Sequence, residues 1–168
     1  MDQLVQSIID SLKNLGPGGM IIFLISLLPI LELRGGILAG TLLGVDWPIA
    51  YLICVIGNLL PIPFILLFIR KIFDWMRNTR FVKLVDKLEA KAEKKSAKVT
   101  KYKKFGLFLF VAIPLPGTGG WTGALIASVL KMRLKDSLPP IIAGVLVAGF
   151  VMTLLSYGVL GSLFGWGG

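Results

Sequence analysis

The chain has 168 residues, of which 55% are hydrophobic and 16% are charged, with 18 basic residues, nine acidic residues and no histidine. This composition excludes an ordinary soluble domain and predicts a single all-α integral membrane domain over residues 1–168. The net charge of +9 does not indicate a nucleic-acid partner, because thirteen of the basic residues gather in residues 70–104 beside an apolar run. Such a block is typical of a cytoplasmic loop that contacts anionic lipid.

The amino-terminal part of the chain predicts two elements. Residues 1–19 place apolar side chains on one face of a helix and polar side chains on the opposite face. This pattern predicts an interfacial amphipathic helix closed by the glycines and proline at 16–19. The apolar run that follows, at 20–45, is interrupted by Pro29, Glu32 and Arg34. Its first half, Met20 to Leu31, reaches about 18 Å as a helix and cannot cross a hydrocarbon core of about 30 Å.

A full membrane span is predicted next, and it completes a first repeat over residues 20–69. Asp46, Trp47 and Pro48 are residues that begin helices at a membrane surface, and 49–69 is long and apolar enough to span. Within it, Asn58 either hydrogen-bonds across helices or lines a cavity, and prolines at 61 and 63 are expected to kink the span.

Residues 70–104 predict a basic, cytoplasmic, amphipathic segment, and residues 105–168 a second repeat. The second apolar run, 105–130, is interrupted at 113–120 by prolines and glycines. Ser137 is expected to cap the last span, which Pro139 and Pro140 begin and which extends to about Phe164.

The two repeats align on their prolines, with Pro29 on Pro114 and Phe23 on Phe108. Downstream, the small residues Gly36, Gly40 and Gly44 are matched with Gly120, Ala124 and Ser128. We therefore expect an inverted repeat of a re-entrant helical hairpin plus a transmembrane helix, with both termini outside. That arrangement keeps basic flanks inside and acidic flanks outside, whereas four plain crossings are the alternative.

Glu32 and Arg34 are ionisable residues inside an apolar run, where each is costly to insert. They either form a structural ion pair at the hairpin tip or act on a ligand, with Arg34 binding an anion and Glu32 accepting a proton or cation. Helix N-termini at both tips favour a phosphate near the membrane midplane. The predicted substrate-binding residues are Arg34, Gly35, Gly36, Gly117, Thr118, Gly119, Gly120 and Thr122, with Glu32 as the ion-coupling residue. Asn58 and Trp121 are candidates for lining the cavity, and packing against the neighbouring helix is the favoured alternative for Trp121.

The stretches Pro29–Gly35 and Pro114–Gly123 resemble the signature stretches of the small multi-drug export protein family of prokaryotic membrane proteins. This resemblance implies drug export across the cell membrane. The repeated plan of hairpin and span is more distantly similar to the DedA superfamily, which implies facing re-entrant hairpins and transport of polyprenyl phosphate coupled to protons or cations. That kinship implies a coupling and phosphate-binding pair in Glu32 and Arg34. The second hairpin lacks the acidic and arginine residues of the DedA pattern.

Three functions are consistent with these features. The leading hypothesis is a transporter for an anionic lipid such as polyprenyl phosphate or a phospholipid; the others are proton-coupled export of small amphipathic drugs and a non-transporting membrane scaffold. We do not expect an enzyme, because the chain lacks histidine, paired carboxylates and a cysteine constellation, Cys54 being its one cysteine. We expect no metal and no cofactor, membrane lipids as partners, and a homodimer in the inner membrane of a prokaryote.

Overall fold

The computed structural model describes residues 16–78, 82–83, 86–87, 90 and 102–160. These residues form helices and turns with no strand among them, which confirms the all-α prediction for this part of the chain. Most of the predicted amino-terminal helix and of the basic segment lies outside the described residues, as does the end of the last span. The chain divides into two compact units: unit 1 comprises residues 1–58 and 149–168, and unit 2 comprises residues 59–148.

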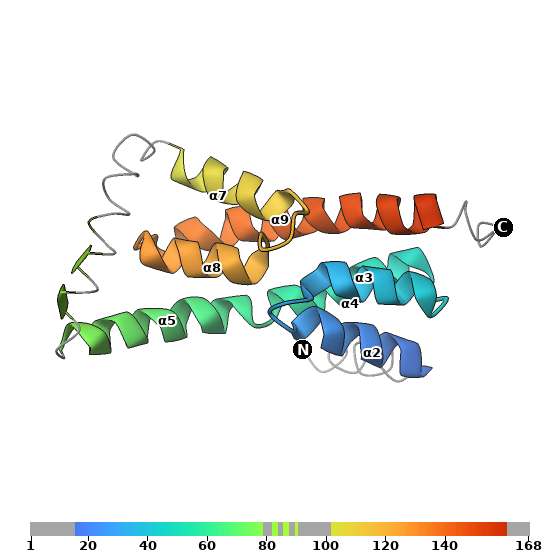
Figure 1. The fold of residues 1–168 in the computed structure, drawn as a ribbon, viewed down its shortest axis with the longest axis horizontal. Coiled ribbons are helices and arrows are strands. Elements are labelled where there is room, and N and C mark those ends of the chain that lie inside the picture. The colour runs from blue at the N-terminus through green and yellow to red at the C-terminus, as the bar shows by residue number, and fades with distance from the viewer. Residues whose placement is uncertain (1–15, 79–81, 84–85, 88–89, 91–101, 161–168) are drawn as a thin grey trace, which may run out of the picture. The chain divides into compact units, whose positions relative to one another are not determined.

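Unit 1 contains a hairpin of two short helices, α2 (Gly16–Leu27) and α3 (Glu32–Leu42), which pack side by side (Figure 1). The break between them follows from Pro29, which has no N–H to continue the hydrogen bonds of α2. The next helix starts when the Glu32 N–H donates to the Leu28 carbonyl over 2.9 Å. The pair is antiparallel, because Gly18 on α2 approaches Val45 after α3, and Ser26 approaches Gly36.

The helix α4 (Trp47–Leu59) packs antiparallel on α3. A Cβ atom built on Gly40 would lie 3.1 Å from the Cβ of Ala50, and one built on Gly36 would lie 2.7 Å from the Sγ of Cys54. The π-helix η1 (Leu154–Leu160) also packs on α3. The hydroxyl of Tyr157 on η1 donates to the Val45 carbonyl over 2.7 Å, which ties η1 to the end of the hairpin.

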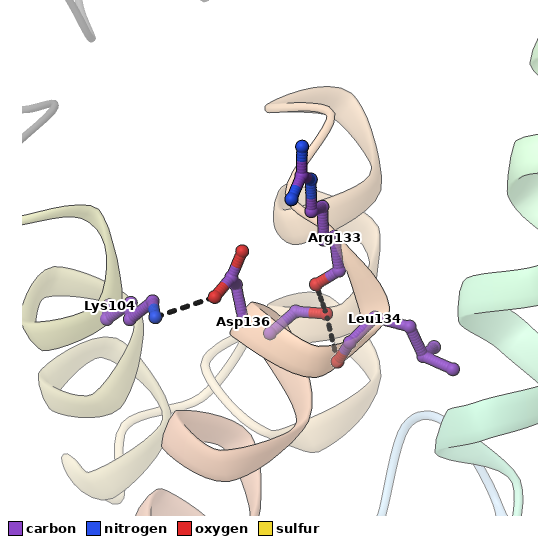
Figure 2. A network of polar contacts seen from close by, with 5 residues as sticks. Lys104, Arg133, Leu134 and Asp136 are labelled. Atoms are coloured by element: carbon purple, nitrogen blue, oxygen red, sulfur yellow. Dashed lines mark hydrogen bonds and ion pairs between the residues drawn. The ribbon is translucent and has the colours of Figure 1, made fainter.

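Unit 2 contains α5 (Ile62–Arg77), a second hairpin made of α7 (Lys103–Ala112) and α8 (Gly120–Val129), and most of α9 (Leu134–Thr153). The ammonium of Lys104 lies 2.6 Å from the Asp136 carboxylate, so the start of α7 meets the start of α9 (Figure 2). The chain therefore enters and leaves this hairpin at the same end. Because both side chains are substantially exposed, this ion pair contributes little to stability, but it shows that the two helix starts lie close together.

Two helical segments are long and apolar enough to cross a membrane, Trp47–Ile72 and Leu134–Val159, among the described residues. The first corresponds to the predicted span at 49–69. It is interrupted at Leu60 and Pro61, where Pro61 and Pro63 remove the N–H groups that would join α4 to α5. The irregularity predicted at these prolines is therefore present as a break between α4 and α5.

Three predicted boundaries are wrong. The helix α2 begins at Gly16, so the glycine and proline turn placed at 16–19 is its first turn, where a proline costs no hydrogen bond. The helix α9 begins at Leu134 and contains both prolines, while the Ser137 hydroxyl donates back to the Arg133 carbonyl over 3.0 Å and caps nothing. The helix α5 continues to Arg77, into the segment predicted to be separate from residue 70.

The contacts within the first hairpin and α4 have counterparts, residue by residue, within the second hairpin and α9. Gly36 meets Ser26 and Cys54, and 87 residues later Gly123 meets Val111 and Ile141. A Cβ atom built on Gly57 would lie 3.1 Å from the Phe23 carbonyl oxygen, and one built on Gly144 would lie 3.0 Å from the Phe108 carbonyl oxygen. Counterparts thus differ by 85 residues in the first helix of each hairpin and by 87 after the break, since two more residues separate the matched positions in the second repeat.

Both hairpins also end in the same turn, which extends this correspondence. The residue after each hairpin adopts a positive φ, 68° at Gly44 and 52° at Lys131. The next N–H closes the helix in a Schellman arrangement, from Val45 to Gly40 over 2.9 Å and from Met132 to Ala127 over 3.0 Å. The sequence-based match of Gly36, Gly40 and Gly44 with Gly120, Ala124 and Ser128 is therefore wrong by three positions.

Close helix packing at Gly36 predicts a large effect of one added methyl group. A Cβ there would collide with the Ser26 hydroxyl and approach the Ile22 carbonyl at 3.0 Å, so we expect Gly36→Ala to lower stability by about 1–3 kcal/mol. Thermal unfolding in detergent measures this. The control is Gly106→Ala on α7, where the new methyl meets nothing within 4 Å and stability should hold or rise by about 0.5–1 kcal/mol. Equal stability of both variants would contradict the packing described for the hairpin.

Candidate functional site

Glu32 is the first residue of α3 and lies at the break of the unit 1 hairpin. Its side chain is 5% exposed, and its backbone φ is +49°, a conformation that non-glycine residues seldom adopt. Such strain costs about 1–3 kcal/mol and clusters at functional sites. At the counterpart position, 87 residues on, unit 2 has Gly119. The carboxyl group, rather than the backbone geometry, therefore explains why a glutamate occupies this turn.

Arg34 follows two residues later on the same helix and is half-buried. Residues two apart on a helix point away from one another, which explains how one side chain is enclosed while the other reaches the surface of the unit. The two groups interact electrostatically. The carboxylate of Glu32 also lies in the first turn of α3, where the helix dipole favours a negative charge.

Asn58 on α4 is fully buried, and neither its Oδ1 nor its Nδ2 has a hydrogen-bond partner. Leaving such a group unsatisfied costs about 1–3 kcal/mol. The antiparallel packing of α3 on α4 sets the direction of the two helices: Gly40 lies opposite Ala50 and Gly36 opposite Cys54, so the end of α4 that holds Asn58 lies toward the start of α3. The buried amide and the buried carboxyl therefore share one end of unit 1.

The predicted ligand-binding glycines of unit 1 have packing contacts. Gly36 is buried against α2 and α4, and a Cβ on half-buried Gly35 would lie 2.8 Å from the Cβ of Leu31 and 3.2 Å from Ile25. These glycines allow the two halves of the hairpin to approach closely.

The tip of the unit 2 hairpin is a loop closed by Thr118. Its hydroxyl lies 2.7 Å from the Ile113 carbonyl and accepts the N–H of Leu115 over 3.2 Å, so it holds the loop together. Gly117 supplies the positive φ of +82° that the turn requires. Gly119 and Gly120 are buried at the start of α8, Thr122 is half-buried in its first turn, and no side chain caps this helix.

An apolar groove of about 470 Å³ lies between α5 and α8 in unit 2. Its lining residues are Pro61, Phe64, Ile65, Leu67, Phe68, Lys71 and Trp121. Trp121 thus lines a groove with α5, and Lys71 is its one charged lining residue. Sequence reasoning missed the groove, although aromatic residues four apart at 64 and 68 on a predicted helix were a signal that one face of it carries rings.

The predicted site residues fall into two groups. Glu32, Arg34, Gly35, Gly36 and Asn58 belong to unit 1, whereas Gly117 to Thr122 belong to unit 2. Within the part of the chain that the structure describes, no cluster of three His, Cys, Asp or Glu residues could hold a metal ion.

A sequence profile of the family described as "Putative small multi-drug export protein" matches residues 32–151, well over half of the chain. The chain belongs to this family. The match to the small multi-drug export family begins at Glu32 and covers α3, α4, α5 and both helices of the second hairpin. The predicted family resemblance is confirmed. A search of the curated proteins found no match to the chain, and a search of the solved structures found none either.

Proposed function

We propose that this membrane protein is a transporter that exports small amphipathic molecules, with Glu32 as the carboxyl group that couples export to proton entry. The observation that carries the proposal is the burial of Glu32, in a strained backbone conformation, at the break of an apolar hairpin. The family description, which names small multi-drug export, supports the same class of function. Catalysis is not part of the proposal.

The chemistry of coupling follows from the surroundings of Glu32. Apolar surroundings disfavour the charged form of a carboxyl group, so a buried glutamate binds a proton readily. Arg34 and the N-terminus of α3 act in the opposite direction, because each favours the carboxylate. A carboxyl group balanced in this way can exchange a proton for a cationic amphipathic substrate.

The proposal includes a membrane arrangement for the two hairpins. The helices α2 and α3 have 12 and 11 residues, so each reaches about half of a hydrocarbon core about 30 Å thick. We therefore propose that each hairpin is re-entrant and that the two enter from opposite faces as an inverted repeat. Residues 70–104 are then cytoplasmic and both termini lie outside. A second copy of the chain is proposed to complete the transport path.

Glu32→Gln tests the coupling role. The variant keeps the shape of the side chain and removes the titrating proton, so we expect proton-driven efflux of ethidium from proteoliposomes to fall at least tenfold. The control is Asp136→Asn, which removes an exposed carboxylate at the start of α9 and should transport at the unmodified rate. Efflux by Glu32→Gln at that same rate would refute the proposal.

The uncapped start of α8 favours a second candidate, an anionic lipid. Helix N–H groups without a side-chain cap, next to buried Gly119 and Gly120, suit a phosphate. In this candidate the guanidinium of Arg34 also binds a phosphate.

Lipid flux separates the two candidates. If the substrate is an anionic lipid, Arg34→Ala should reduce the flux of fluorescent phosphatidylglycerol in reconstituted vesicles at least tenfold, because the guanidinium binds the phosphate. The control Arg133→Ala removes an exposed arginine before α9 and should leave flux intact. Ethidium efflux without lipid flux would reject this candidate, and the absence of either flux would favour the non-transporting scaffold.

A further inference from the structure

The matched contacts of the two units reveal a difference in the chemistry of their cores. Where unit 1 has Ser26, Cys54 and Asn58, unit 2 has Val111, Ile141 and Val145 at the counterpart positions. All six residues are buried. Because unit 2 packs the same arrangement of helices with apolar side chains, packing does not require polar groups at these places in unit 1.

Two of the three polar groups have partners that account for them. The Ser26 hydroxyl donates to the Ile22 carbonyl over 2.8 Å, as serines within helices commonly do, and the Cys54 thiol hydrogen-bonds with that hydroxyl. Asn58 differs from both, because its amide is fully buried without a hydrogen-bond partner. A group retained at this cost, where valine fills the counterpart position, points to a second state in which it is used.

We infer that Asn58 is the positioning residue for the proton that Glu32 binds and releases, an inference that rests on the proposed function. Gly40 lies opposite Ala50 and Gly36 opposite Cys54, and this register, continued by one turn, brings the amide level with the carboxyl group. A primary amide suits both forms of that group: Nδ2–H donates to the carboxylate, and Oδ1 accepts the O–H of the protonated acid. Asn58 therefore allows Glu32 to ionise inside an apolar hairpin and still receives the proton when it returns.

The charged and titratable groups around Glu32 in unit 1 come from α3, α4 and η1. Arg34 on α3 interacts with Glu32 electrostatically, and α2 carries no titratable side chain over Gly16–Leu27. On α4, Cys54 lies opposite Gly36 and Tyr51 packs near Gly149, and on η1 the hydroxyl of Tyr157 lies near Gly40. Cys54 and Tyr157 therefore lie one and two turns along α3 from Glu32, while Tyr51 touches Gly149, which also meets Leu33 beside Glu32. Asn58 is the residue of α4 that the same register, continued by one turn, brings level with Glu32.

The protonation of Glu32 can be followed without substrate. Dicyclohexylcarbodiimide enters apolar sites and modifies protonated carboxyl groups, and mass spectrometry of the detergent-purified full chain measures the labelled fraction of Glu32 at each pH. In Asn58→Val, which installs the residue of the counterpart position, the carboxylate loses a charge-assisted hydrogen bond, which is stronger than the neutral bond that the protonated acid loses. Labelling should then persist to a pH at least one unit higher than in the unmodified protein, a tenfold change in proton concentration. Asn58→Thr has the shape of valine with a hydroxyl group and should label as the unmodified protein does.

The matched control is Ser26→Val, which also installs the unit 2 residue at a buried polar position and should leave the labelling curve unchanged. An unshifted curve in Asn58→Val, or no pH-dependent labelling of Glu32 in the unmodified protein, would overturn the inference. If Asn58→Val does not fold, the same comparison is made between Asn58→Ala and Asn58→Ser. Because labelling needs no transport, a shifted curve without ethidium efflux would refute the proposed function alone, and efflux with an unshifted curve would refute this inference alone.

Discussion

The arrangement of this protein depends on a constraint that apolar surroundings place on the backbone, whose N–H and C=O groups must be satisfied within the fold. Pro29 removes one such donor and ends α2, and the chain restarts as α3 through the bond from the Glu32 N–H to the Leu28 carbonyl. In unit 2 the longer break at 113–119 is closed by the hydroxyl of Thr118 instead. Each break turns an apolar run into a hairpin and places the start of a new helix at its tip.

A shared framework with different chemistry is the main result of comparing the two units. The glycines that bring the helices together, the Schellman turns and the contacts to α4 and α9 match throughout. Against that background unit 1 alone buries a carboxyl group and an unsatisfied amide, at Glu32 and Asn58, among the described residues. The duplication thus supplies an internal reference, which separates the residues that packing requires from those that it does not.

Much of the fold could be predicted from the sequence because it depends on local chemistry. Prolines in apolar runs located both breaks, and Asp46 located the start of α4. Interpretation failed where a residue is compatible with two roles, as for Ser137, which can cap a helix or bond back to a preceding carbonyl. The alignment of the repeats failed because the extra two residues of the second break carry no pattern of their own. The packing of α4 on α3, with Gly36 opposite Cys54, could not be predicted, because it depends on the register of two helices.

The claim on which this account depends most is that both hairpins turn back inside the membrane. Single cysteines at Pro17 and Asp46, which flank the first hairpin, and at Lys104 and Lys131, which flank the second, can be introduced on a Cys54→Ala background and labelled with a membrane-impermeant maleimide. The account predicts that Pro17→Cys and Asp46→Cys react from the outside of intact cells, and that Lys104→Cys and Lys131→Cys react only once the cytoplasmic face is opened. Labelling of the two flanks of either hairpin from opposite faces would contradict it.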